Sequence, residues 1–133
     1  MARAISFSEL KNLKKKFSQK KIGLSHGAFD ILHLGHLKHF EIAKKNVDIL
    51  VVSLTGDKYI KKGPNNPYNN QNKRASFLKH IKNIDFVYID ENITAENIIT
   101  NLKPDLYFKG KDYLEKDISG NLSKEIKKLK YYG

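Results

Sequence analysis

The sequence predicts an α/β protein in which helices cover both faces of a mainly parallel sheet. Short apolar runs rich in β-branched residues alternate along the chain with amphipathic helical segments, which is the pattern of repeated strand–helix–strand units. The run 48–54 is almost continuously apolar, as expected of a strand that is buried on both faces of a parallel sheet. Together these observations predict a Rossmann-like three-layer α/β/α sandwich.

The first half of the chain contains a helix followed by one strand–helix–strand unit. Ser6 and Glu9 have the spacing of a capping box, so the first helix is expected to begin after Ser6. Ile5 and Leu10 are placed for the accompanying hydrophobic staple. Strands are expected over 21–25 and 48–54. The helix between them is expected to turn one apolar face to the sheet, made by Leu37, Phe40, Ala43 and Val47.

The second half of the chain continues the alternation. Residues 63–70 are rich in Gly, Pro and Asn, which predicts a loop, and a strand is expected over 86–89. Thr94 is placed to cap a helix that ends before Pro104, and a strand is expected over 106–108. A helix over 73–82 is expected to bury Phe77, Leu78 and Ile81, and a last helix is marked by Leu122, Ile126 and Leu129.

Composition narrows the class of protein. The 133 residues suit one domain, expected to span 1–133. The formal net charge is +11, yet among the 25 basic residues only Arg3 and Arg74 are arginines. Because bidentate readout of base edges favours arginine, the lysine excess fits small phosphorylated substrates, and nucleic acid is not expected as a partner. The absence of cysteine excludes disulfides and thiolate catalysis.

No apolar run is long enough to cross a membrane, so no membrane partner is expected. Residues 1–10 lack the apolar core of a secretory signal. A soluble cytoplasmic protein is therefore predicted.

The strongest functional signal is the pair His33 and His36, with Gly35 between them, where an apolar strand gives way to a helix. Residues three apart in a helix share a face, so both imidazoles can point at one spot near the positive end of the helix. Backbone amides at such an end bind phosphate readily. No Cys, Asp or Glu accompanies the pair in metal-ligand spacing, so the pattern predicts phosphate chemistry and no metal site of the protein's own. Of the other histidines, one is placed to line the site and two are expected on helix surfaces (His26; His39 and His80).

The stretch Gly27-x-Phe29-Asp30-x-x-His33-x-Gly35-His36 resembles the signature of the cytidylyltransferase-like nucleotidyltransferases. Within that family the chain is most similar to the adenylyltransferase domains of bacterial ADP-heptose synthases, and less similar to glycerol-3-phosphate cytidylyltransferases. The resemblance runs from about Ile5 to the end of the chain. Its further matches are Thr55-Gly56-Asp57, Lys61-Lys62, Arg74 at the start of a helix, and Pro104-Asp105-x-x-x-Lys109-Gly110-x-Asp112-Tyr113.

The resemblance implies a single displacement, in which a sugar phosphate oxygen attacks the α-phosphorus of a nucleoside triphosphate and pyrophosphate leaves. Mg²⁺ is expected to enter with the triphosphate and bridge its oxygens, and Gly35 to leave space between the histidines for the base or ribose. The catalytic residues that the resemblance implies are His33, His36, Arg74 and one or both of Lys61 and Lys62, all in contact with phosphate. The nucleotide-binding residues that it implies are Gly27, Ala28, Phe29, Asp30, Gly35, Lys109, Gly110 and Asp112.

The substrates that the resemblance favours are ATP and a sugar phosphate such as a heptose 1-phosphate. Two alternatives stay open: a cytidylyltransferase for glycerol phosphate or another alcohol phosphate, and a nucleotide-binding domain with little activity. The second alternative rests on a departure from the family, whose members continue with a further strand and an Ile-Ser-Thr-Thr-like segment that opens a final helix. Because this chain ends at Tyr131-Tyr132-Gly133, it is expected to turn over poorly. The family likeness also implies a homodimer and a fused or separate sugar kinase as partner.

Overall fold

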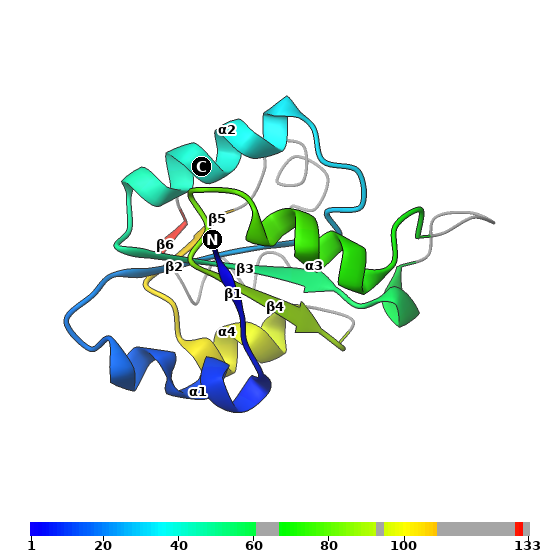
Figure 1. The fold of residues 1–133 in the computed structure, drawn as a ribbon. Helices are drawn as coiled ribbons and strands as arrows, with labels where there is room; N and C mark the ends of the chain where they lie inside the picture. Colours follow the sequence, from blue (N-terminus) through cyan, green and yellow to red (C-terminus); the bar gives the residue numbers. More distant parts are fainter. Residues whose placement is uncertain (61–66, 93–94, 109–129, 132–133) are drawn as a thin grey trace.

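The computed structural model describes residues 1–60, 67–92, 95–108 and 130–131. Its centre is a six-stranded sheet with the strand order β1-β4-β3-β2-β5-β6, in which neighbouring strands are parallel (Figure 1). The strands are Arg3–Ala4 (β1), Ile22–Gly27 (β2), Ile49–Thr55 (β3), Phe86–Asp90 (β4), Leu106–Phe108 (β5) and Lys130–Tyr131 (β6). The predicted parallel sheet is confirmed. The two-residue strand β1 was not predicted, and β6 lies where the family's further strand was expected to start.

Helices cover both faces of the sheet. The helices α1 (Phe7–Lys16) and α4 (Glu96–Leu102) lie on one face, and α2 (Leu34–Lys45) and α3 (Gln71–Lys79) lie on the other (Figure 1). A short 3-10 turn, η1 (Asp57–Tyr59), follows β3. The α/β/α sandwich is therefore confirmed. The longest described helix, α2, has 12 residues, and no helix in the described part of the chain is long and apolar enough to cross a bilayer.

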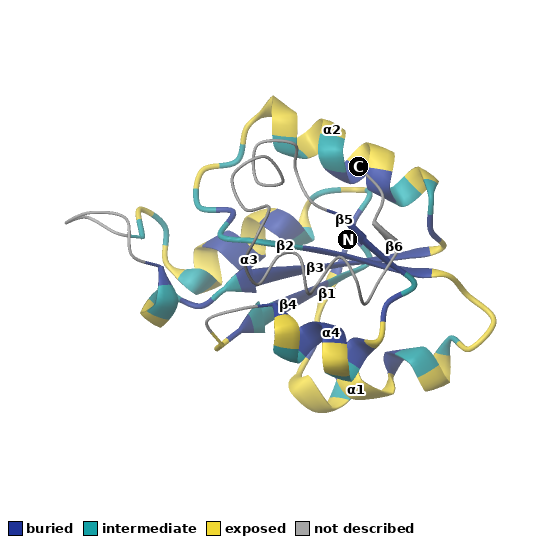
Figure 2. Ribbon diagram, turned by 180° about the vertical axis from the view of Figure 1, so that it is seen from behind, coloured by how far each residue is buried: buried dark blue, intermediate teal, exposed yellow. Residues whose placement is uncertain are grey.

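Two apolar cores pack on opposite faces of the sheet. Along β3, Leu50, Val52 and Leu54 face the core under α2 and α3, whereas Ile49 and Val51 face the core over α1 and α4. Side chains alternate between the faces of a strand, so a strand buried on both sides must be apolar at nearly every position. Figure 2 shows this strand dark along its length, which explains why the run 48–54 lacks a polar face.

The first helix begins as predicted. Ser6 Oγ accepts a hydrogen bond from Glu9 N at 3.2 Å, and Ser6 N donates to the Glu9 carboxylate at 3.2 Å. Ile5 and Leu10 are both buried, as a hydrophobic staple requires. The local pattern therefore determines where α1 starts.

Two predicted core residues are wrong. Leu37 is 42% exposed and Phe77 is 53% exposed. In α2 the buried face is centred on Phe40 and Ala43, and in α3 the fully buried Arg74 faces the interior in the same turn as Leu78. Burial of a guanidinium rotates α3 so that Phe77 points outward, which a rule that buries apolar side chains cannot anticipate. The expected cap Thr94 and the expected last helix lie outside the described residues.

Candidate active site

The site is built at the N-terminus of α2, which follows the carboxyl end of β2. His33 is the N-cap of the helix, and its Nδ1 accepts a hydrogen bond from Gly35 N at 3.0 Å. In return His33 N donates to Nδ1 of His36 at 3.2 Å. The two imidazoles therefore cap the first turn reciprocally, as Ser and Glu do in an ordinary capping box.

This capping determines which nitrogen of each imidazole carries a proton. Since Nδ1 of both His33 and His36 accepts from a backbone N–H, the proton of each neutral ring lies on Nε2. Burial lowers the pKa of His36, and the charge of His33 lowers it further, so His36 is neutral at neutral pH. The ring centroids are 4.1 Å apart. The arrangement thus brings two N–H donors together at the positive end of a helix.

The predicted proximity of the two histidines is confirmed, but its details differ. His33 lies just outside the helix, and the amide of Gly35 is already bonded to the His33 ring. The space above Gly35 is also filled by that ring, because a Cβ at Gly35 would lie 2.7 Å from His33 Cε1. Glycine at this position therefore lets the imidazole fold back onto the helix, rather than keeping a gap between the two rings.

Phe29 packs against His36 from a strained backbone conformation. Its φ is 50°, which is in the left-handed region that non-glycine residues rarely adopt. The buried ring contacts His36 edge-on at 5.7 Å between centroids and packs on Phe40 at 5.4 Å. A Cβ at Gly27 would lie 3.1 Å from the same ring. Backbone strain of this kind costs on the order of 1–3 kcal/mol and persists where surrounding contacts enforce it.

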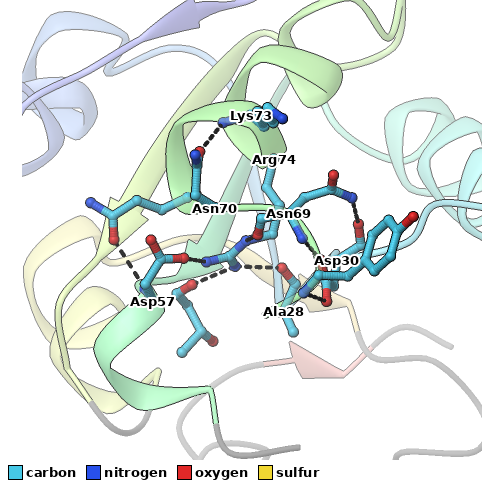
Figure 3. A network of polar contacts seen from close by, with 10 residues as sticks. Ala28, Asp30, Asp57, Asn69, Asn70, Lys73 and Arg74 are labelled. Atoms are coloured by element: carbon cyan, nitrogen blue, oxygen red, sulfur yellow. Dashed lines mark hydrogen bonds and ion pairs between the residues drawn. The ribbon is translucent and has the colours of Figure 1, made fainter. Parts of the chain in front are cut away.

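Arg74 ties three loops together beneath the site (Figure 3). Its Nη1 donates to the carbonyl oxygens of Ala28 at 2.9 Å and Thr55 at 2.6 Å, and its Nε donates to the carbonyl oxygen of Asn69 at 3.0 Å. Its Nη2 contacts the Asp57 carboxylate at 2.7 Å. The side chain is fully buried. In this structure Arg74 therefore positions the chain after β2 and β3, and its contact with phosphate stays a prediction.

Asp30 makes a second connection to the same segment (Figure 3). Its carboxylate accepts from the backbone N–H groups of Tyr68 and Asn69, each at 2.7 Å, and the Asn69 side chain donates to its carbonyl oxygen at 2.8 Å. Both carboxylate oxygens of Asp30 are thus engaged with the backbone before α3. In this structure Asp30 therefore positions the segment before α3, and its role in orienting the site stays a prediction.

Two histidines outside the motif also contact the sheet. His39 was expected on a helix surface, but it is half-buried and its Nε2 lies 2.9 Å from Ser25 Oγ on β2. Burial lowers the pKa of His39, and the charge of His36 lowers it further. On β2, Nδ1 of His26 lies 2.6 Å from Ser53 Oγ on β3. The contact between His39 and Ser25 could have been anticipated from the spacing of His36 and His39, since positions three apart share one helix face.

The remaining predicted residues fall into two groups. His80 is exposed, as expected, and it bonds only locally, with Nδ1 2.8 Å from the Ser76 carbonyl oxygen. No group of three His, Cys, Asp or Glu side chains suited to a metal ion occurs among the described residues. The other predicted site residues lie outside the described ranges, and these are Lys61, Lys62, Lys109, Gly110 and Asp112.

The sequence of this chain is similar to those of curated bacterial proteins. The chain is 39% identical over 147 aligned positions to the bifunctional protein HldE of Campylobacter fetus subsp. fetus (strain 82-40), with 95% of this chain and 32% of that protein covered. It is 38% identical to the protein of the same name from Aliarcobacter butzleri (strain RM4018), with 95% and 28% covered. The chain thus spans about a third of the length of the curated relatives that it matches.

Solved structures share the fold. The lipopolysaccharide core biosynthesis protein from Thermoplasma volcanium GSS1 superposes with a TM-score of 0.68 at 26% identity, over 84% of this chain and 93% of that one. A pantoate-beta-alanine ligase from Francisella tularensis superposes with a TM-score of 0.72 at 16% identity, over 99% and 66%, which shows the fold alone. The model of the family described as cytidylyltransferase-like matches residues 24–132, a range that contains the paired histidines and four of the six strands in full. The chain therefore belongs to the cytidylyltransferase-like family.

Proposed function

We propose that the chain transfers AMP from ATP to a sugar phosphate such as a heptose 1-phosphate, with release of pyrophosphate. The observation that carries this proposal is the pair of imidazoles at the start of α2, each with Nδ1 bonded to the backbone. Support comes from the match to the cytidylyltransferase-like family and from the likeness to proteins named HldE. A fused or separate sugar kinase, which the family likeness implies as partner, belongs to the proposal as well.

The proposed reaction needs hydrogen-bond donors at the α-phosphate, because negative charge on its oxygens is rearranged as the acceptor attacks and pyrophosphate leaves. The Nε2–H groups of His33 and His36 meet this need without losing contact with the helix. Each ring bonds to the first turn of α2 through Nδ1, so the positive end of the helix polarises the donor on Nε2. One donor aimed at a developing charge is worth about 2.7–4 kcal/mol, or about 100- to 1000-fold in rate.

Magnesium in this scheme is part of the substrate. Both carboxylate oxygens of Asp30 are engaged by backbone amides, and in this proposal the phosphates would supply most of the magnesium ligands. Bound there, Mg²⁺ would neutralise charge on the triphosphate. The buried Arg74 keeps the segments after β2 and β3 in register with the helix terminus.

A sharp test measures pyrophosphate release and nucleotide-sugar product for each pair of triphosphate and acceptor. ATP and CTP are combined with a heptose 1-phosphate, mannose 1-phosphate and glycerol 3-phosphate. We expect product with ATP and the heptose 1-phosphate, and a loss of at least about 100-fold in kcat for His36→Ala. His80→Ala is the matched control, since His80 is an exposed histidine with one local bond.

Two outcomes would overturn the proposal in different ways. Preference for CTP with glycerol 3-phosphate would establish the cytidylyltransferase alternative. Nucleotide binding without product from any pair would favour the non-catalytic alternative. The homodimer, the cytoplasmic location and the phosphate contacts of Lys61 and Lys62 stay predictions.

A further inference from the structure

A row of polar side chains crosses three strands on the face of the sheet that α1 and α4 cover. On β3, Ile49 and Val51 face this side, so the alternation of side chains places Ser53 and Thr55 there too. On β4, Phe86 and Tyr88 face the same side, and the same alternation places Asp90 there. Thr55 and Asp90 are direct register partners. The polar positions gather at the carboxyl ends of these strands, where ligands of parallel sheets bind.

Asp90 is the unusual member of this row. It is fully buried. Its Oδ1 accepts from the backbone N–H of Asn92 at 3.3 Å and from the Asn92 side chain at 2.9 Å. Its Oδ2 is buried and has no hydrogen-bond partner in the described part of the chain. Burial raises the pKa of Asp90. A buried carboxyl oxygen without a donor is rare in folded proteins, and a missing ligand is one explanation.

The neighbours of Asp90 offer further polar groups. His26 Nδ1 lies 2.6 Å from Ser53 Oγ, and its Nε2 lies 3.5 Å from Thr55 Oγ1. The row therefore combines hydroxyl and imidazole groups with one carboxyl group, that of Asp90.

The row adjoins the proposed reaction centre. His26 directly precedes Gly27, at the start of the turn that leads to His33. Thr55 links the polar row to the proposed reaction centre. Its carbonyl oxygen accepts a hydrogen bond from Arg74 at 2.6 Å, and its side chain lies on the polar row. Phosphate would be repelled by the carboxylate form of Asp90. A neutral group that bears several hydroxyls fits these donors and acceptors.

We propose that the row of His26, Thr55 and Asp90 binds hydroxyl groups of the acceptor sugar, with Asp90 Oδ2 as a specificity-determining acceptor. The proposal rests on the proposed function and names the part of that site that selects the acceptor. The histidine pair engages the phosphates, and the polar row engages the carbon skeleton of the sugar. Because Oδ2 is buried in the free chain, binding requires a local rearrangement at the end of β4.

The test is calorimetric titration of two probes, a heptose 1-phosphate and magnesium–ATP, into the wild type and four variants. Asp90→Ala removes the acceptor, Asp90→Asn keeps its shape, and Thr55→Val removes a hydroxyl with little change in volume. Asp85→Asn is the matched control, because Asp85 is a partly buried aspartate at the opposite end of β4, paired with Lys44 at 2.7 Å. Thermal unfolding of each variant verifies that it folds.

We expect Asp90→Ala to weaken the binding of the heptose 1-phosphate at least about tenfold, with a smaller loss of affinity for Asp90→Asn and for Thr55→Val. Binding of magnesium–ATP is expected to stay within about twofold in all variants, and Asp85→Asn to leave both affinities unchanged. Should Asp90→Ala fail to fold, Asp90→Asn and Thr55→Val decide the question.

Three results would overturn the proposal: unchanged sugar binding in the Asp90 and Thr55 variants, no sugar binding by the wild type, or a selective loss of ATP. The last would assign the row to the nucleotide ribose. Product formation is measured on the same wild-type preparation. Selective loss of sugar binding without product in the wild type would refute adenylyl transfer while retaining the hydroxyl subsite.

Discussion

Replacing Arg74 with lysine tests how much of the fold depends on one buried guanidinium. The guanidinium donates to three backbone carbonyl groups and contacts one carboxylate, from a fully buried position. A lysine ammonium keeps the charge, but its N–H donors all lie on one nitrogen. They cannot replace donors that are spread over the three nitrogens of a planar guanidinium. We expect at least two of the four interactions to be lost. At about 1–1.5 kcal/mol for each, Arg74→Lys should lower the free energy of unfolding by about 2–3 kcal/mol.

The measurement is equilibrium urea unfolding of the wild type, Arg74→Lys and Arg3→Lys. Arg3 is the only other arginine of the chain, and its pair with Glu9 at 2.6 Å is exposed, with 56% and 40% of the two side chains accessible. Exposed pairs contribute about 0–1 kcal/mol, so the control should differ little from the wild type. Equal midpoints for Arg74→Lys and the wild type would refute the view that Arg74 holds the three loops together. A changed m-value would instead indicate a change in the compactness of the unfolded or native state, or a loss of two-state unfolding.

Three further predictions concern the histidines. The pKa values of His36 and His39 are lowered in the folded chain, so the unfolded chain binds protons first and stability should fall as pH decreases below about 6.5. We expect Tm to decrease between about pH 7 and about pH 5, and a constant Tm in the wild type over this range would contradict the prediction. Gly35→Ala places a Cβ 2.7 Å from Cε1 of His33, so kcat should fall at least about tenfold while circular dichroism stays native, and normal kcat would show that the ring need not fold back. Ser25→Ala removes the partner of His39 and should cost about 1 kcal/mol in urea unfolding, whereas no cost would mean that water replaces the hydroxyl.

Much of the fold followed from local patterns in the sequence. The apolar run of β3, the capping box at Ser6 and the order of strands and helices each depend on residues that are close in the chain. The error at Phe77 has a different origin, because the buried face of α3 depends on polar partners elsewhere in the chain. Arg74 faces inward to reach the carbonyl groups of Ala28 and Thr55, which are 46 and 19 residues away.

The candidate site could be located from the sequence but not constructed from it. The spacing of His33 and His36 placed two imidazoles at one helix terminus, and the structure confirms their proximity. The reciprocal bonds between their rings and the backbone depend on His33 being outside the helix, which a helical-wheel argument does not represent. The contact of His39 with Ser25 was missed because a histidine in a polar stretch was assigned to solvent.

The capping role of the two imidazoles limits the chemistry that they can perform. An Nδ1 that accepts from a helix N–H cannot take a proton without uncapping the first turn, and Nε2 already carries one. In this arrangement neither ring can act as a general base. In the proposed reaction the two rings therefore suit a nucleophile that arrives already anionic, as a phosphate oxygen does at neutral pH and an alcohol or amine does not. The helix cap thus suits these two imidazoles to an acceptor that needs no deprotonation by them.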